Sequence, residues 1–458
     1  MKTTLSLIAV AALLAACAGP EPRKPTAAEA AQAALPAPAF PNAGGSGAAA
    51  AAELPWAQAF QGTRLQRLIP LALANNRDLR IAAANIESAR ATAAAREADL
   101  WPTVNAGISG SRTPNANGGI TSIYQAGLQV SAYELDLFGR LRSLDAAAAA
   151  LLLGAEANQQ AVRIALVGAV ATAEIALQAD EALLRITRDT LASREQSLSL
   201  IRQRFEGGII SEIDLRAGES ALQATRVALA QTQRQRALDE NALVLLLGSA
   251  LPADLPAPTG LLVDFEPLAE LPAGLPSEVL TRRPDLRQAE AQLSAADANI
   301  DAARAAFFPR ITLTGSLGTS SNQLSNLFKN SAWTFAPQLL QPLFDAGRNR
   351  ANLIQARAQR DIALAQYERA IQSAFRDVAD ALAGRATLAE QRGAQAAQVD
   401  AEARRLALAQ ERYRAGISSS LDVLDAQRSL FTAQQALVQV QSLRAQNLVA
   451  VYRVLGGG

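Results

Sequence analysis

The chain has 458 residues, of which 50% are apolar, and its 43 basic and 42 acidic residues leave a formal net charge of +1. This balance gives no electrostatic footprint for nucleic acid, so we expect no nucleic-acid partner. The chain also has no histidine and a single cysteine, which excludes most zinc, haem and cysteine–histidine chemistry. We therefore expect neither a metal site nor a cofactor.

Residues 1–16 have the pattern of a secretory signal peptide. Lys2 supplies the positive start, and the apolar run from Leu5 to Leu14 is too short to span a bilayer. Cys17 follows Leu-Ala-Ala directly, which resembles the bacterial lipobox, where the thiol receives lipid. The alternative is an ordinary cleavage site beside a chance cysteine. We expect lipid attachment at Cys17, and an outer-membrane location because Ala18, rather than aspartate, follows it.

Residues 17–52 predict a lipid-anchored tether. The segment is rich in alanine and proline, contains Gly-Gly-Ser-Gly at 44–47, and shows no apolar periodicity. A semi-extended segment of this composition cannot build a core of its own. The remaining chain divides into a first structural repeat at 53–274 and a second at 275–458.

Residues 76–247 and 283–455 are two copies of one design. The matched segments are NRDLR at 76–80 with RPDLR at 283–287, LWPTV at 100–104 with FFPRI at 307–311, and RFEGGIISEIDL at 204–215 with RYRAGISSSLDV at 412–423, each pair 207 or 208 residues apart. A unit of about 200 residues is far longer than a solenoid repeat of about 20–50 residues. The pattern indicates duplication of half a domain and one pseudo-symmetric body.

Each repeat contains one long helix and two shorter companions. The long helices are expected at 142–205 and 348–414, the companions at 76–100 and 212–247 and at 284–307 and 420–455. At 1.5 Å per residue each long helix spans roughly 95–100 Å, so two companions stacked end to end would lie alongside it. Helices with two solvent-exposed faces and narrow alanine-rich contacts to their neighbours suit the wall of a tube. A coiled coil or spectrin-like bundle has the same pattern, and helical periodicity leaves both open.

Four short segments alternate between apolar and polar residues, as strands that cross an outer membrane do. They lie at 103–111, 124–131 and 311–317 and around Trp333, Phe335 and Leu339, with loops expected at 112–122 and 318–332. Pro337 belongs at a strand end or bulge, because proline cannot donate to the sheet. Half of a soluble sandwich is the alternative. Four strands cannot close a barrel, and three chains would supply twelve.

The whole mature chain resembles the outer-membrane efflux proteins of the TolC class, specifically the OprM-like lipoprotein branch. The segments that carry the resemblance are YELDLFGRLR at 133–142, RRPDLRQAEAQLSAADANIDAARAAFFPRITLTGSLG at 282–318, PLFDAGRNRANL at 342–353 and RYRAGISSSLDVLDAQRSLFTAQQAL at 412–437. The resemblance implies a mainly α fold with a small β part. It implies a homotrimer with a twelve-stranded outer-membrane β-barrel continued by a twelve-helix periplasmic α-barrel.

The glycine turns near 208 and 416 are the candidate functional positions. Glycine tolerates the left-handed cap needed where a helix reverses, and Ser211 and one of Ser418 to Ser420 can cap the next helix. The resemblance implies that these turns form the periplasmic tips and meet an adaptor protein. The candidate contact residues are Arg204, Gly208, Ile209, Ser211, Asp214, Arg412, Gly416, Ile417 and Ser419.

Asp422 and Asp425 lie three residues apart, on one face of the helix that follows the second turn. They are favourable acids near a helix N-terminus, and in a trimer they would place six carboxylates around one opening. The resemblance assigns this region to a periplasmic gate, with Leu421 and Tyr413 as steric partners. A ring of acids favours cations and could hold a divalent ion. Ala217 stands at the position that matches Asp425, so only the second repeat supplies the pair.

We therefore expect a passive exit duct of a tripartite efflux pump, together with a periplasmic adaptor and an inner-membrane pump. The sequence shows no catalytic constellation and no GxxxxGK[ST] loop, so we do not expect an enzyme. One alternative is a type I secretion duct, and another is a periplasmic coiled-coil lipoprotein without a pore. A carboxylate-based hydrolase would need an apolar pocket with convergent acids.

Overall fold

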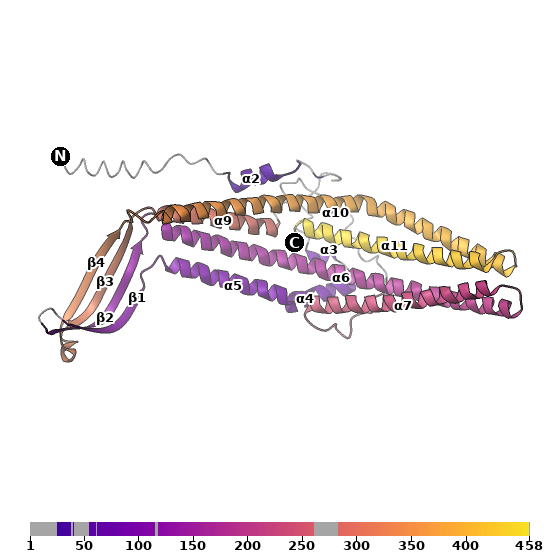
Figure 1. The fold of residues 1–458 in the computed structure, drawn as a ribbon, viewed down its shortest axis with the longest axis horizontal. Helices are drawn as coiled ribbons and strands as arrows, with labels where there is room; N and C mark the ends of the chain where they lie inside the picture. The colour runs from indigo at the N-terminus through magenta and orange to yellow at the C-terminus, as the bar shows by residue number, and fades with distance from the viewer. Residues whose placement is uncertain are drawn as a thin grey trace.

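The structure is a computed structural model that describes residues 25–37, 40, 55–60, 62–114, 118–260 and 283–457. The predicted signal peptide, Cys17 and much of the predicted tether lie outside the described residues. The described chain forms a small β-sheet at one end and a long bundle of helices that extends away from it (Figure 1).

The predicted helices are all present, with nearly the predicted bounds. The first repeat contains α5 (Arg77–Ala98), α6 (Arg140–Glu206) and α7 (Glu212–Leu247), and the second contains α9 (Pro284–Ala305), α10 (Arg348–Arg414) and α11 (Ser420–Val454). Helices α6 and α10 have 67 residues each, or about 100 Å at 1.5 Å per residue. The short helices are α2 (Ala27–Ala34), α3 (Trp56–Ala59) and α4 (Thr63–Asn75).

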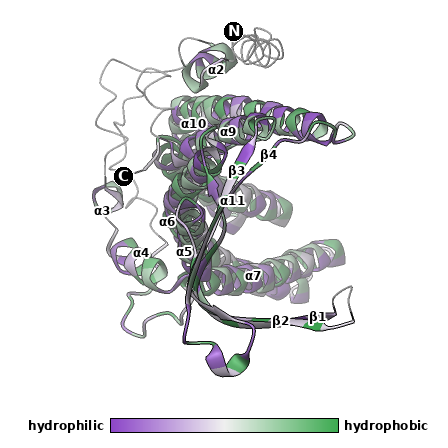
Figure 2. Cartoon of the chain, turned by 90° about the vertical axis from the view of Figure 1, so that its left-hand side faces the viewer, coloured by the Kyte–Doolittle hydropathy of each residue, from purple (hydrophilic) through white to green (hydrophobic). Residues whose placement is uncertain are grey.

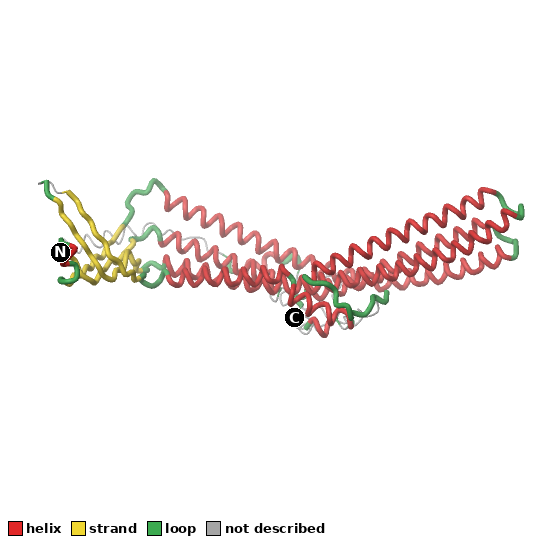
Figure 3. The backbone as a smooth tube through the Cα atoms, turned by 90° about the horizontal axis from the view of Figure 1, so that it is seen from below, coloured by secondary structure: helices red, strands yellow, loops and turns green. Residues whose placement is uncertain are grey.

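The helices form one curved wall. Helix α6 packs against α5 and α7 on one side and against α9 and α11 on the other, and α10 packs against α9 and α11. Two companion helices therefore lie end to end along each long helix, as predicted (Figures 1 and 3). Viewed from the sheet end, the wall is an arc that runs from α10 to α5 and α7 (Figure 2). Its two edges are α10 on one side and α5 with α7 on the other.

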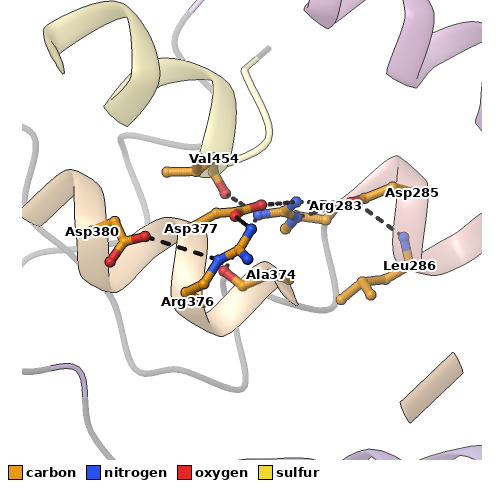
Figure 4. Close-up of polar contacts among 8 residues, drawn as sticks. All are labelled: Arg283, Asp285, Leu286, Ala374, Arg376, Asp377, Asp380 and Val454. Atoms are coloured by element: carbon orange, nitrogen blue, oxygen red, sulfur yellow. Dashed lines mark hydrogen bonds and ion pairs between the residues drawn. The ribbon is translucent and has the colours of Figure 1, made fainter. Parts of the chain in front are cut away.

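The repeated motif at residues 76–80 and 283–287 closes the junction between each pair of companion helices. The Asn76 side chain donates a hydrogen bond to the Leu246 carbonyl near the end of α7, at 2.9 Å. At the matching place, the Arg283 guanidinium donates to the Val454 carbonyl at the end of α11, at 3.3 Å, and binds Asp285 at 2.7 Å (Figure 4). Each motif thus joins the start of the companion helix nearer the sheet, α5 or α9, to the end of the companion helix farther from it, α7 or α11.

The main apolar core lies at mid-height, where both repeats meet. It combines buried residues of α4, α6, α7, α10 and α11, among them Leu68, Ile175, Leu243 and Tyr452. Helix α6 contains one window that is long and apolar enough to cross a membrane, by length and composition only. That window is 44% buried inside the protein, and α6 contributes Leu166, Val170 and Ile175 to this core.

The sheet has four antiparallel strands in the order β1-β2-β3-β4. The strands are β1 (Val104–Pro114), β2 (Ile120–Leu135), β3 (Arg310–Ser321) and β4 (Ser331–Leu340). The predicted loops at 112–122 and 318–332 were too long, because pairing continues to Pro114 opposite Ile120 and to Thr319 opposite Ser331. Both hairpins are therefore longer than alternation alone indicated.

One face of the sheet is apolar and the other polar, as predicted. The register aligns Ala106, Leu128, Leu317 and Trp333 in one row across the strands, and Asn105, Gln129, Ser316 and Thr334 in a row of opposite orientation. The exposed large apolar side chains on the first face are Val104, Ile108, Ile120, Leu128, Leu317, Trp333, Phe335 and Leu339. The placement of Pro337 was wrong: it lies inside β4 opposite Leu313, and the pairing of β3 with β4 has no bulge there. Within a single chain β4 is an edge strand, which tolerates a proline.

The predicted tether contains a helix that composition did not predict. Thr26 and Glu29 form a capping box at the start of α2, which satisfies backbone donors that would otherwise be unpaired. Ala30 and Ala34 are buried in a cluster with residues of α9 and α10, and the Phe40 ring stacks on Phe375 at 4.7 Å. This part of the tether therefore binds the outside of the wall, because small side chains allow α2 to approach closely.

Candidate functional site

The two helix turns at residues 204–215 and 412–423, hereafter the tips, lie at the end of the wall farthest from the sheet (Figures 1 and 3). Gly208 and Gly416 have φ angles of +70° and +75°, a left-handed conformation that glycine adopts without steric cost. The amide of Ile209 donates to the Arg204 carbonyl and that of Ile417 to the Arg412 carbonyl, each at 2.9 Å. The predicted glycine turns are thus present and alike in both repeats.

Each tip starts its second helix with a capping box. Ser211 caps α7 together with Asp214, and Ser419 caps α11 together with Asp422. In each box the serine hydroxyl accepts from the aspartate amide at 3.3 Å, and the carboxylate accepts from the serine amide. Ser419 is the capping residue among the three serines that the sequence left open. The Asp422 carboxylate is therefore directed back to its own cap.

Two contacts join the first tip to the second. The Arg204 guanidinium donates to the Tyr413 carbonyl at 3.0 Å and lies 4.2 Å from the centre of its ring. The Ser420 hydroxyl donates to the Asp214 carboxylate at 2.6 Å. Hydrogen bonds from Ser211 and then Ser420 lower the pKa of Asp214 below its ordinary value, so this carboxylate stays ionised and keeps both acceptor oxygens.

Asp425 has two arginine partners. Its carboxylate binds the guanidinium of Arg405 from α10 and that of Arg428 one turn further along α11, at 2.5 Å each. Hydrogen bonds from Arg405 and then Arg428 lower the pKa of Asp425. Within one chain, Asp422 and Asp425 are therefore held by different partners. Neither arginine was predicted from the sequence as a partner of Asp425. Arg405 lies 11 residues before Gly416 and Asp425 nine after it, and this near-equal spacing about the turn could have indicated the pair.

The two expected steric partners of the aspartates differ in exposure. Tyr413 is buried, with 6% of its surface exposed, whereas Leu421 is 64% exposed. The Tyr413 hydroxyl has no hydrogen-bond partner in the described part of the chain. Ile209 and Ile417 are also exposed, one on each tip. The tips therefore present aliphatic side chains to the outside, while the aromatic ring packs beneath the arginine.

Across the residues that the structure describes there is no group of three or more potential metal-ligating acids or cysteines. A groove of about 710 Å³ at mid-height is lined mainly by small residues of α6 and by longer side chains of α11, with Asp239 as its acidic member. A carboxylate-based hydrolase would need convergent acids, and this groove does not bring them together.

Comparisons with known proteins agree with the duplicated architecture. The model of the outer membrane efflux protein family matches the chain twice, over residues 68–249 and 275–457. A toluene efflux pump outer membrane protein of Pseudomonas putida, TtgC, is 45% identical over 470 aligned residues that cover 100% of this chain and 96% of that protein. The outer membrane protein OprJ of Pseudomonas aeruginosa is 42% identical over 88% of this chain and 86% of its own length.

The same similarity holds in three dimensions. The open-state crystal structure of the MtrE outer membrane channel of Neisseria gonorrhoeae superposes with a TM-score of 0.84 and 38% identity. The alignment covers 96% of this chain and 98% of that one. Both the sheet and the helical wall are therefore part of the shared architecture.

Proposed function

This chain belongs to the outer membrane efflux protein family and is an outer-membrane efflux channel, and on this premise we propose how it works. Three copies close into a passive exit duct that carries drugs or other small molecules from the periplasm, or from an inner-membrane pump, to the exterior. The similarity to a relative named for toluene efflux supports small organic cargo. The duct itself performs no chemical step, and the pump supplies the energy.

The observation that carries the proposal is the four-stranded sheet with one apolar and one polar face, at the end of a helical wall about 100 Å long. Four strands cannot form a closed barrel, because small membrane barrels need at least eight. Three copies would supply twelve strands, with the apolar face toward lipid and the polar face toward the lumen. Closure of this kind also removes both edges of the sheet.

The edges of the helical wall support the same arrangement. Exposed apolar side chains lie on both edge elements, α5 with α7 and α10: Ile81, Val227, Leu238, Leu245, Ile354, Ile362 and Leu408. Exposed aliphatic surface is costly in water at roughly 25 cal/mol per Å². In a ring of three walls, α10 of one copy would lie beside α5 and α7 of the next, so both edges would be covered.

The proposed partners follow from the two ends of the duct. Cys17 anchors the chain to outer-membrane lipid, and the tips meet a periplasmic adaptor and, through it, an inner-membrane pump. The residues proposed for the adaptor contact are Arg204, Gly208, Ile209, Ser211, Asp214, Arg412, Gly416, Ile417 and Ser419. The exposure of Ile209 and Ile417 supports this role, because an adaptor helix hairpin could cover them.

The proposed gate consists of Leu421, Asp422, Asp425 and Tyr413, brought together three-fold around the periplasmic opening. In each copy, Arg405 and Arg428 hold the Asp425 carboxylate, and Arg204 holds Tyr413. Opening then requires the second tip to move away from the first, which breaks the contacts of Arg204 with Tyr413 and of Asp214 with Ser420.

The gate is tested by conductance in planar bilayers with the variant Asp422→Ala/Asp425→Ala. Loss of both carboxylates removes the Asp422 half of the α11 capping box and leaves Arg405 and Arg428 without their shared anion, so the closed channel should conduct several-fold more. The matched control is Glu212→Ala, which removes an exposed acid bound to Arg216 at the same end and should leave conductance unchanged. Unchanged conductance in the double variant would exclude the aspartates from the gate.

Two other assignments make different predictions. A type I secretion duct shares the fold but would export a polypeptide, so the test is whether deletion of the chain blocks protein secretion or raises drug sensitivity. A periplasmic coiled-coil lipoprotein without a pore would never expose β1 and β2 at the cell surface. Labelling of a cysteine placed within residues 112–122 from the exterior of intact cells would exclude it.

A further inference from the structure

The turn that leads from the sheet into α6 makes an aromatic contact between the two repeats. The Phe138 ring, just before α6, stacks on the Phe308 ring, just after α9, with 4.8 Å between centroids and 10° between planes. Helices α6 and α9 are neighbours in the wall. The stacked pair therefore joins one helix entrance to the adjacent helix exit, at the level where the wall meets the sheet.

The exit of α5 is built like the exit of α9. Trp101 lies 207 residues before Phe308, and its amide donates to the Ala98 carbonyl at 3.0 Å, as that of Phe308 does to Ala305 at 3.1 Å. The preceding carbonyls are also bound alike. The Tyr133 hydroxyl donates to the Leu100 carbonyl at 3.0 Å, and the Gln341 amide donates to the Phe307 carbonyl at 3.2 Å. Trp101 thus occupies the place of Phe308 in the first repeat.

The entrance of α10 likewise corresponds to the entrance of α6. Each helix starts after a left-handed glycine, Gly139 at φ +78° and Gly347 at φ +84°, and each is preceded by a Leu-Phe pair. An aspartate, Asp136 or Asp345, accepts from amides of the first turn in both. The two turns differ in register, because Phe138 directly precedes Gly139 whereas Phe344 stands three residues before Gly347. Phe344 is nevertheless the aromatic residue of the turn that enters α10, as Phe138 is of the turn that enters α6.

The aromatic side chains at these two pairs of helix ends differ in exposure. Phe138 and Phe308 are 46% and 38% exposed, whereas Trp101 and Phe344 are 71% and 90% exposed. Trp101 follows the edge helix α5, and Phe344 precedes the edge helix α10. In a closed ring, α10 of one copy stands beside α5 of the next, as α6 stands beside α9 within the chain.

We propose that Phe344 of each copy packs against Trp101 of the neighbouring copy, which gives three subunit-joining aromatic contacts at the base of the barrel. This inference rests on the trimer of the proposed function and adds its specific contact. The occupant is a second copy of this chain because the corresponding pair within the chain already shows ring-to-ring packing at this level. Offset-stacked rings contribute beyond their buried area, so the contact would also set the register between subunits.

Photo-crosslinking tests the contact directly. With p-benzoylphenylalanine at position 344, irradiation of the purified channel should yield covalent dimers and trimers, with the adduct mapped by mass spectrometry to the peptide that contains Trp101. The same residue at position 138 is the matched control. It should crosslink to Phe308 of its own chain, leaving the mass of the denatured species at one copy.

A cysteine pair provides an independent measurement. Phe344→Cys/Trp101→Cys treated with a short bismaleimide should give covalent trimer on a denaturing gel, whereas Phe138→Cys/Phe308→Cys should give only internally linked monomer. Either single variant alone should give no oligomer ladder. If electron microscopy shows intact trimers but residue 344 crosslinks only to lipid, or within its own chain, the proposed contact is wrong and the duct stands. If no trimer exists, the contact and the duct fail together.

Discussion

Asp180 is a buried acid in the seam between α6 and α7, where it faces Asp239. Burial, followed by the hydrogen bond and the charge of Asp239, raises the pKa of Asp180 to about 7, against a smaller opposing effect of Arg236. One Asp180 oxygen is buried without a hydrogen-bond partner among the described residues. A proton shared between the two carboxylates would supply that partner. Arg236 does not neutralise the pair, because its guanidinium also binds Glu181 and Glu240.

The raised pKa makes stability depend on pH in a defined direction. Between the ordinary value of 3.8 and about 7, the folded chain holds a proton that the unfolded chain has released, so stability falls as pH rises through this window. Asp180→Asn removes that loss, and at pH 8 it should stabilise the channel by roughly 1–2 kcal/mol. Thermal unfolding by circular dichroism at pH 5 and pH 8 measures the effect. The control Asp189→Asn changes an exposed position on the same helix and should keep the pH dependence of the parent chain. If Asp180→Asn also kept that pH dependence, the shared proton would be excluded.

At the scale of elements, α4 is attached to the wall by a buried ion pair. The Arg64 guanidinium binds the Glu174 carboxylate on α6 at 2.6 and 3.0 Å and also donates to the Pro256 carbonyl. Gln178 donates to Glu174 at 2.7 Å and accepts from the Gly260 amide at 2.9 Å. One network thus binds both α4 and the segment after α7 to the middle of α6.

Loss of the buried arginine should cost far more than loss of an exposed one. Arg64→Ala leaves Glu174 buried without its cation, and breaking such a pair costs about 3–5 kcal/mol. Arg67→Ala on the same helix removes the exposed pair with Asp254 and should cost about 1 kcal/mol or less. Guanidinium unfolding followed by circular dichroism compares the two variants. Equal midpoints would show that α4 is held by apolar packing rather than by the ion pair.

The sequence predicted the elements well where periodicity and duplication agree. The bounds of α7 and α10, and the serine and glycine residues of the tips, follow from local chemistry that any helix end must satisfy. Prediction from the sequence failed for features that depend on contacts between residues far apart in the chain. The Arg405 partner of Asp425 lies on another helix, α10, and α2 forms because Ala30 and Ala34 find a surface on α9 and α10. Strand ends were missed because cross-strand pairing, rather than alternation, determines where β1 and β2 stop.

At the scale of the whole molecule, both parts of the chain are incomplete in the same way. In the part of the chain that the structure describes, the sheet has two unpaired edges, β1 and β4. The wall likewise has two apolar edges, α5 with α7 and α10. Because β1 follows α5 in the chain and β4 precedes α10, each strand edge continues from the corresponding helix edge. A single rotation between copies can therefore cover all four edges. A contact between the helix edges alone would leave β1 and β4 uncovered.

This common rotation predicts the particle that electron microscopy should show. The detergent-purified channel should be a three-fold rod roughly 130–140 Å long, from about 100 Å of helix and a barrel that crosses a bilayer of about 30 Å. Twelve strands and twelve helical columns should be countable in cross-section, since each copy contributes four of each. The same sample after denaturation provides the single-chain control on a gel. A monomeric or two-fold particle would exclude the twelve-stranded barrel shared by three copies. The lipoprotein without a pore would then be the better account.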